Sequence, residues 1–110
     1  MTISNVYKRA AKGAELLDNL NPGWFKKIKI HELYMSNCGH CVLGQLYGSY
    51  WDGLISIELE SDAYVNIEEY GFKESYRSNY GYEELDKEWK IQIQERLNHE
   101  NADQTIREAS

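Results

Sequence analysis

The chain has 110 residues, of which 42% are hydrophobic and 13% aromatic, a size and composition typical of one folded domain rather than a disordered chain. Its net charge of −6 is unevenly divided: residues 1–50 hold six basic and three acidic residues, whereas residues 51–110 hold six basic and fifteen acidic residues. This balance argues against direct nucleic-acid binding, which needs concentrated positive charge. The acidic second half is typical of ordinary solvated helix faces, and the alternative is an acidic surface that docks on a basic partner.

The sequence predicts neither a membrane segment nor an exported chain. No apolar run reaches the roughly 18 residues needed to span a bilayer. The N-terminus, Met1-Thr2-Ile3-Ser4-Asn5, lacks the basic and apolar regions of a signal peptide. Two cysteines three residues apart do not form the disulfide framework of a secreted domain. We therefore expect no membrane association and a cytoplasmic location.

The first predicted helix covers residues 4–19. Steps of three and four residues place its apolar side chains on one face, namely Val6, Ala10, Ala14, Leu17 and Leu20. Gly13 lies inside this helix and weakens it by about 1 kcal/mol relative to Ala. Asn21-Pro22 then restarts the chain, because Asn is a good N-cap and Pro suits the first helical position. A short helix is therefore predicted over residues 22–27.

The segment from Cys41 onward is predicted to form one longer helix. One of its faces carries Val42, Leu46, Tyr50 and Leu54, and another is nearly bare because Gly44 and Gly48 lie on it. Small residues at this spacing predict a close helix contact inside the protein, with a dimer seam as the alternative. A ligand or a partner chain could occupy the same groove. The candidate binding residues are therefore Gly44, Tyr47, Gly48, Tyr50 and Trp51.

Residues 54–60 alternate between apolar and polar side chains, which is strand periodicity, and both helix and strand stay open for this span. If the span is a strand, residues 28–31 are its expected partner, in a two-stranded β element with residues 55–59. Ser61-Asp62 has the capping chemistry that begins a further helix, ending at Gly71, a good left-handed cap residue. Residues 72–81 are expected to form a loop.

The clearest amphipathic helix is predicted over residues 82–97, where Tyr82, Leu85, Trp89 and Ile93 share one face. Trp89 is expected to be buried against the first helix and the Cys41–Tyr50 segment. Residues 98–110 are predicted to be a polar C-terminal tail that is frayed or disordered. The expected fold is mainly α, a compact bundle of four to five short helices forming a single domain over residues 1–97, with the β element as an open alternative.

Cys38-Gly39-His40-Cys41 looks like the active-site tetrapeptide of protein disulfide isomerases, in which a thiolate at a helix N-terminus is paired with a resolving thiol. The context argues against a thioredoxin-like fold. Such a fold needs a buried strand before the motif, but Tyr34-Met35-Ser36-Asn37 contains no β-branched residue. It also needs a cis-proline downstream, and the only proline, Pro22, lies upstream.

A zinc site is the second chemical reading of the same motif. A closed site needs four ligands, and Cys38 and Cys41 could supply two, with His31 and His99 as the outside candidates. A dimer could instead pool four cysteines. The leading interpretation is that both cysteines are reduced and that Cys41 packs in the core, as free cysteines often do.

The stretch Cys41-Val42-Leu43-Gly44-Gln45-Leu46-Tyr47-Gly48-Ser49-Tyr50 is the most distinctive part of a pattern that covers most of residues 13–93. The rest comprises Gly13 to Asp18, Pro22-Gly23-Trp24, Leu33 to Met35, Tyr70-Gly71-Phe72, Tyr82, Leu85 and Trp89. The pattern resembles a group of small proteins encoded by bacteriophages and by bacterial genomes that carry prophages. This resemblance implies an accessory protein acting in the cytoplasm of the infected host cell, and it supplies no catalytic residues.

No phosphate loop, nucleophile elbow or catalytic triad is apparent, so neither a cofactor nor an enzymatic activity is predicted. The leading hypothesis is a non-enzymatic protein that binds a host factor and inhibits a host defence system. In one version, acidic helices dock on a basic host protein. In the other, a homo-oligomer traps a small nucleotide signal with the tyrosines and basic residues of the first half. The alternative hypothesis is a zinc-binding or thiol-redox protein centred on Cys38-Gly39-His40-Cys41.

Overall fold

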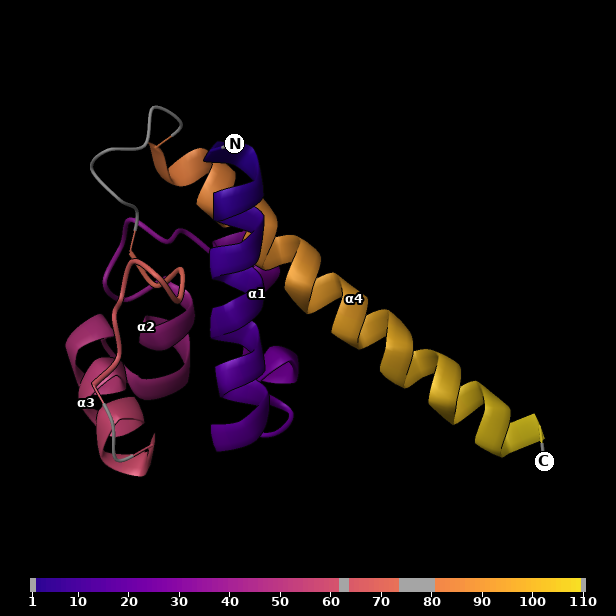
Figure 1. Cartoon of the computed structure of the whole chain (residues 1–110). Coiled ribbons are helices and arrows are strands. Elements are labelled where there is room, and N and C mark those ends of the chain that lie inside the picture. The colour runs from indigo at the N-terminus through magenta and orange to yellow at the C-terminus, as the bar shows by residue number, and fades with distance from the viewer. Residues whose placement is uncertain (1, 62–63, 74–80, 110) are drawn as a thin grey trace.

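The structure is a computed structural model that describes the backbone of residues 2–61, 64–73 and 81–109, and the side chains of residues 6–61, 64–73 and 82–100. Its helices are α1 (Thr2–Leu20), α2 (Val42–Tyr47), α3 (Tyr50–Ser61) and α4 (Gly81–Ala109), with two short 3-10 helices, η1 (Trp24–Lys27) and η2 (Ile30–Glu32). Figure 1 shows α1 crossing the first half of α4, and α2 and α3 packed together beside α1. The predicted mainly α architecture is confirmed.

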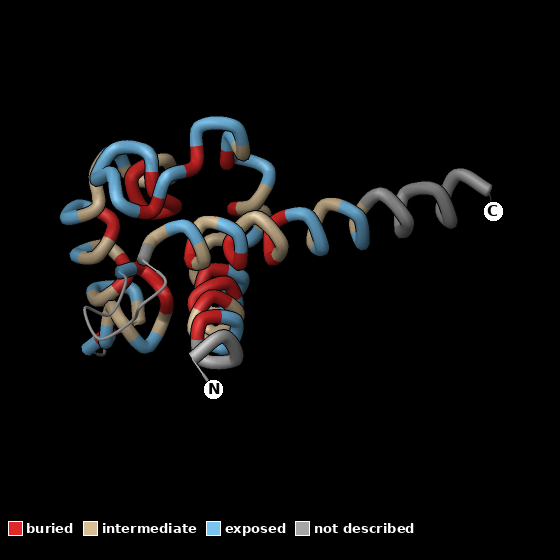
Figure 2. Tube along the Cα trace, turned by 90° about the horizontal axis from the view of Figure 1, so that it is seen from above, coloured by how far each residue is buried: buried red, intermediate tan, exposed pale blue. Residues whose placement is uncertain are grey.

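Helix α1 buries the face that its sequence predicts. Val6, Ala10, Ala14 and Leu17 are each at most 2% exposed. Figure 2 shows buried positions recurring along α1 and along the part of α4 that faces it, whereas the described residues of α4 beyond Ile93 are mostly exposed or half-buried. The core therefore lies mainly between these two helices and the segments packed around their crossing.

The restart at Asn21-Pro22 produces a shorter and tighter helix than predicted. The chain passes through Gly23 with a φ of 81° before η1 begins at Trp24, so the predicted helix over residues 22–27 is a single 3-10 turn. Trp24 is fully buried and its indole N–H donates a hydrogen bond of 2.9 Å to Asp18 Oδ1. This bond satisfies the one polar group of a large buried ring.

Of the two alternatives for residues 54–60, the helix is confirmed and the two-stranded β element is wrong, and the described residues contain no strand. Residues 55–59 lie inside α3, and residues 30–31 belong to η2. The local cause is a cap: Ser49 Oγ accepts a hydrogen bond of 3.1 Å from the backbone N–H of Asp52, which starts a helix just before the alternating span. Gly53 does not end the helix. It lies buried inside α3, where its missing side chain allows close packing against Leu43 of α2.

The helix predicted to start at Ser61-Asp62 is also wrong for the part of it that the structure describes. Asp62 and Ala63 lie outside the described residues, and residues 64–73 form turns without a helix. Asn66 organises one turn, since its Oδ1 accepts hydrogen bonds from the backbone N–H groups of Glu68 and Glu69. Gly71 has the left-handed conformation expected of it, with a φ of 72°. The predicted loop over 72–81 lies largely outside the described residues.

Helix α4 is longer than the predicted span of residues 82–97, and it continues to Ala109. It therefore covers most of the residues for which the sequence predicts a polar tail, and fraying of this end stays a prediction. Figure 1 shows the second half of α4 extending away from the other helices. No helix among the described residues is long and apolar enough to cross a membrane.

Trp89 on α4 is the centre of the aromatic core. The ring is fully buried, stacks on Phe72 with centroids 5.6 Å apart and meets Trp24 edge-on at 5.8 Å. Its indole N–H donates a hydrogen bond of 2.7 Å to the carbonyl oxygen of Gly71. The predicted contact with α1 is confirmed at Gly13. The surrounding rings come from η1 and from residues 70–72, rather than from the Cys41–Tyr50 segment.

Replacing Trp89 with Ala is expected to lower the free energy of unfolding by about 3–5 kcal/mol, because it removes a fully buried indole ring and leaves a cavity. Trp51→Ala is the matched control, since Trp51 is 64% exposed and its truncation should change stability by no more than about 0.5 kcal/mol. Urea denaturation followed by circular dichroism measures both. Equal losses in the two variants would contradict the assignment of Trp89 to the core.

Candidate interaction site

The segment predicted as one helix from Cys41 to Leu54 is two helices joined by a sharp break. Gly48 has a φ of 99°, a conformation that residues with a side chain rarely adopt, and it ends α2 after six residues. The predicted single face of Val42, Leu46, Tyr50 and Leu54 therefore does not exist. The break turns α3 back onto α2, and these two helices make one of the two largest helix contacts in the described structure.

The close contact predicted at Gly44 is confirmed, and it is internal. A Cβ atom at Gly44 would lie 2.7 Å from the carbonyl carbon of Gly39 and still closer to the carbonyl oxygen of Cys38. The bare side of α2 is thus filled by the turn that precedes it. A Cβ at Gly48 would meet nothing within 4 Å, so the two glycines do not line a common groove.

The turn before α2 is fixed by hydrogen bonds that both cysteine residues accept from backbone N–H groups. Cys41 is the N-cap of α2, and its Sγ accepts a hydrogen bond of 3.2 Å from the backbone N–H of Gly44. The carbonyl oxygen of Cys38 accepts a hydrogen bond of 2.8 Å from the backbone N–H of Tyr50, at the start of α3. The turn therefore ties the beginnings of α2 and α3 together.

The predicted binding residues are divided between the interior and the surface. Gly44 is buried and Tyr47 is half-buried, with its ring against Gly53. Gly48 is exposed without forming a groove. Tyr50 and Trp51, by contrast, line one cleft, which also contains both cysteines.

This cleft has a volume of about 200 Å³ and is lined chiefly by apolar side chains. It lies between the turn before α2, the start of α3, residues 67–73 and the start of α4. Its lining residues include Met35, Cys38, Cys41, Tyr50, Trp51 and Phe72, and Lys73 is the one cationic side chain among the described residues that line it. Its volume is enough for one side chain of a partner and small for a drug-sized ligand.

The Tyr50 hydroxyl is the unusual polar group at this cleft. Its oxygen is buried and has no hydrogen-bond partner among the residues that the structure describes. Burial, reinforced by the nearby thiols of Cys41 and Cys38 and the phenol of Tyr82, raises the pKa of Tyr50 to about 12. The group is therefore protonated at neutral pH and can donate or accept a hydrogen bond.

The outer face of α3 carries three exposed apolar side chains, which we call the α3 stripe: Trp51, Ile55 and Leu59. They are 64%, 57% and 76% exposed. Because they are spaced four residues apart, they lie on one side of the helix, opposite the buried Gly53 and Ile57. The sequence contained this signal, but the alternating pattern of residues 54–60 obscured the four-residue spacing.

The α3 stripe has an acidic border. Between Tyr50 and Ser61 the helix carries three acidic residues and no basic residue. Helical spacing places Asp52 and Glu58 on the two flanks of the stripe, whereas Glu60 lies two turns from Gly53 on the opposite side. Trp51 belongs both to the stripe and to the lining of the cleft, so the two features form one continuous surface. This surface, apolar along its middle and acidic at its edges, is the candidate site.

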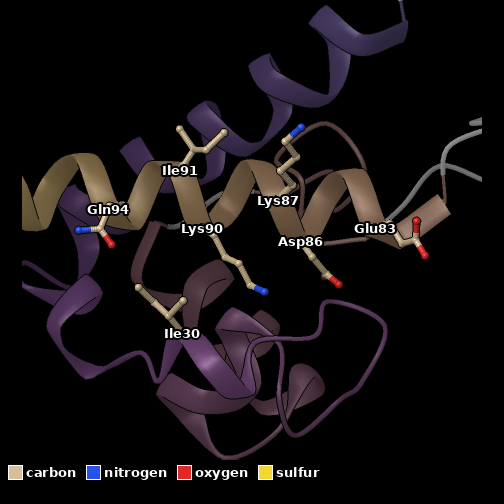
Figure 3. A pocket seen from close by; sticks show the side chains of 7 residues that line it. All are labelled: Ile30, Glu83, Asp86, Lys87, Lys90, Ile91 and Gln94. Carbon is tan, nitrogen blue, oxygen red and sulfur yellow. The ribbon is translucent and has the colours of Figure 1, made fainter.

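A second hollow, of about 550 Å³, lies between Ile30 and one side of α4. Figure 3 shows the side chains of Asp86 and Lys90 on the side of α4 that faces Ile30. Two acidic and two basic side chains line it, so it selects neither sign of charge. Asp86 also has a structural role, because its Oδ1 accepts a hydrogen bond of 2.6 Å from the backbone N–H of Met35.

The metal-ligand candidates do not form one site. Cys41 is buried, whereas Cys38, His31 on η2 and His99 on α4 are exposed. Among the residues that the structure describes, no three His, Cys, Asp or Glu side chains are grouped so that they could hold a metal ion. The four predicted zinc ligands are therefore not brought together within the chain.

Comparisons with protein-family models, with curated proteins and with solved structures found no match. The function of the chain is therefore inferred from its own residues and their arrangement.

Gly44→Ala is expected to destabilise the chain by about 1–3 kcal/mol, because the new methyl group would overlap the Cys38–Gly39 backbone. Helix propensity alone predicts the opposite sign, a gain of about 1 kcal/mol. Gly39→Ala is the matched control, since its Cβ would meet only Asn37 Oδ1 at 3.6 Å. Thermal melting gives the sign of the stability change in each variant. A Gly44→Ala variant more stable than wild type would contradict the internal contact.

Proposed function

We propose that the chain is a non-enzymatic binding protein that docks on a basic protein partner through the α3 stripe and the adjoining cleft. The observation that carries this proposal is the exposure of Trp51, Ile55 and Leu59 in one row on a helix whose opposite face is buried. Burying one such side chain contributes roughly 1.5–3 kcal/mol, so the row offers enough apolar surface to anchor a complex. Trp is also a frequent anchor in protein interfaces.

The acidic border of the stripe determines the chemistry of the partner. A protein with an apolar groove edged by Lys and Arg would bury the three side chains and pair with Asp52 and Glu58. In a two-fold dimer formed through the same face, these carboxylates would lie near their own copies, and like charges oppose such contact. The charge of α3 therefore favours a different, basic protein over a second copy of this chain.

The cleft supports the same mode of binding. Trp51 forms part of its wall, so a partner lying along α3 could place one apolar side chain in the cleft beside Trp51. The Tyr50 hydroxyl is buried at the cleft, so it could hydrogen-bond to a polar group of that partner only where docking opens the cleft. An occupied cleft would add shape complementarity and a polar contact to the interface, and a flat apolar stripe alone provides neither.

The resemblance to small phage and prophage proteins directs the search for the partner to bacterial host proteins. We propose that the chain inhibits a host defence system by covering the basic, nucleic-acid-binding surface of one of its proteins. The nucleotide-trap version has less geometric support. Neither of the two hollows described above brings together the tyrosines and basic residues of the first half of the chain.

Replacing Ile55 with Lys is expected to abolish binding to the partner, because it places a cation in the middle of the stripe opposite a basic surface. Tyr34→Lys is the matched control, since Tyr34 is 53% exposed against 57% for Ile55 and lies outside the stripe. Host proteins retained by wild type and by Tyr34→Lys, but lost from Ile55→Lys, are the candidates. Circular dichroism confirms that both variants are folded.

The purified candidate then provides the quantitative test by calorimetry. Trp51→Ala should weaken the affinity by about 30-fold, the effect of losing one interface anchor worth about 2 kcal/mol. Wild type should bind the partner more tightly at low salt. The loss of affinity caused by Glu58→Lys should therefore be larger at low salt than at high salt. Binding that is unchanged in Ile55→Lys and Trp51→Ala, or the absence of any protein retained selectively by wild type, would refute the proposal.

A further inference from the structure

The two cysteines lie at the same cleft but differ in accessibility. Both line it, and Cys38 is exposed whereas Cys41 is 1% exposed. The Sγ of Cys41 lies 3.8 Å from the carbonyl oxygen of Cys38, so the Cys41 side chain turns back toward the residue that carries the other thiol. A solvent-facing thiol therefore lies beside a protected one.

The turn that carries the two thiols is held by several hydrogen bonds. The carbonyl oxygen of Asn37 accepts from the backbone N–H groups of His40 and Cys41, at 3.2 and 2.9 Å. The Oδ1 of Asn37 accepts from the N–H groups of Gly39 and His40. In such a helical turn, residues three apart lie on one side with their Cβ atoms about 5–6 Å apart. A small movement brings them to the roughly 4.5 Å that a disulfide tolerates.

We propose that Cys38 and Cys41 form a reversible dithiol–disulfide pair that is oxidised by low-molecular-weight disulfides such as oxidised glutathione. The exposure of each thiol assigns its role: Cys38 is the attacking residue and Cys41 the resolving residue. This inference is independent of the proposed docking function, because it concerns only the reactivity of the chain.

The reaction balances in two exchange steps. The Cys38 thiolate attacks one sulfur of oxidised glutathione, forming a mixed disulfide and releasing one glutathione thiolate. The Cys41 thiol then loses its proton to solvent or to that thiolate and attacks the Cys38 sulfur, breaking the mixed disulfide and releasing the second glutathione. The two thiols of the chain are oxidised to one disulfide, and one oxidised glutathione is reduced to two glutathione molecules.

The environment of Cys41 fits a resolving thiol better than an attacking thiol. Burial raises the pKa of the Cys41 thiol, although the backbone N–H of Gly44 opposes this effect. A protonated, buried thiol reacts slowly with a solute, but it can attack a disulfide formed on its neighbour, where the local concentration is high. The pair differs from a thioredoxin-like catalyst, because the described chain contains neither a preceding strand nor a cis peptide bond.

The test uses the full chain, reduced, freed of reductant and mixed with oxidised glutathione, followed by alkylation of free thiols and mass spectrometry. Wild type should lose both thiols and retain no glutathione. Cys41→Ser should stop at one glutathione bound to Cys38, and Ser keeps the cap of α2 because it is a good N-cap residue. Cys38→Ser should react at least about tenfold more slowly than Cys41→Ser, because its remaining thiol is buried.

Denaturant supplies the control. In urea both single variants should react at similar rates, which would tie the difference to the fold rather than to the neighbouring sequence. Dithiothreitol should restore both thiols of oxidised wild type. The proposal is overturned if native wild type accumulates bound glutathione or intermolecular dimers, or if native Cys38→Ser reacts as fast as Cys41→Ser.

Discussion

The rest of the fold depends on the close packing of Trp89 against the bare side of α1 at Gly13. A Cβ at Gly13 would lie 2.8 Å from the Trp89 ring and closer still to the carbonyl oxygen of Tyr70, so only a glycine fits without a shift. The same ring is stacked on Phe72 and hydrogen-bonded to Gly71. One side chain thus joins α4 to α1 and to residues 70–72, segments far apart in the sequence.

At the edge of this core, Asp18 accepts hydrogen bonds from Trp24 of η1 and Arg96 of α4. Burial alone would favour its neutral form, but hydrogen bonds from Arg96 and Trp24 outweigh that effect and hold the pKa of Asp18 below its usual value. With α1, η1 and α4 held in this way, α2 and α3 pack beside α1 as a pair. The inner face of α3 is used in that packing, and the α3 stripe on its outer face is left free for a partner.

The sequence predicted the features that depend on helical spacing and failed where a cap, a left-handed glycine or a tertiary contact overrides the side-chain pattern. The buried face of α1 and the inward position of Trp89 follow from spacing alone, and the contact at Gly44 follows from its missing side chain. The break at Gly48 and the helix over residues 54–60 do not, because a left-handed glycine, the Ser49 cap and the burial of Gly53 override the local pattern. The cleft could not be predicted, since its walls come from four separate segments.

If the Trp89–Gly13 contact holds α1 and α4 together, replacing Gly13 with Ala must destabilise the chain. In an exposed helix, Gly→Ala stabilises by about 1 kcal/mol. At Gly13 we expect the opposite, a loss of about 1–3 kcal/mol in the free energy of unfolding of Gly13→Ala, because the methyl group would displace the Trp89 ring or the Tyr70 carbonyl. Urea denaturation measures this change, and a Gly13→Ala variant that is as stable as wild type or more stable would show that the Trp89–Gly13 contact does not hold the two helices together.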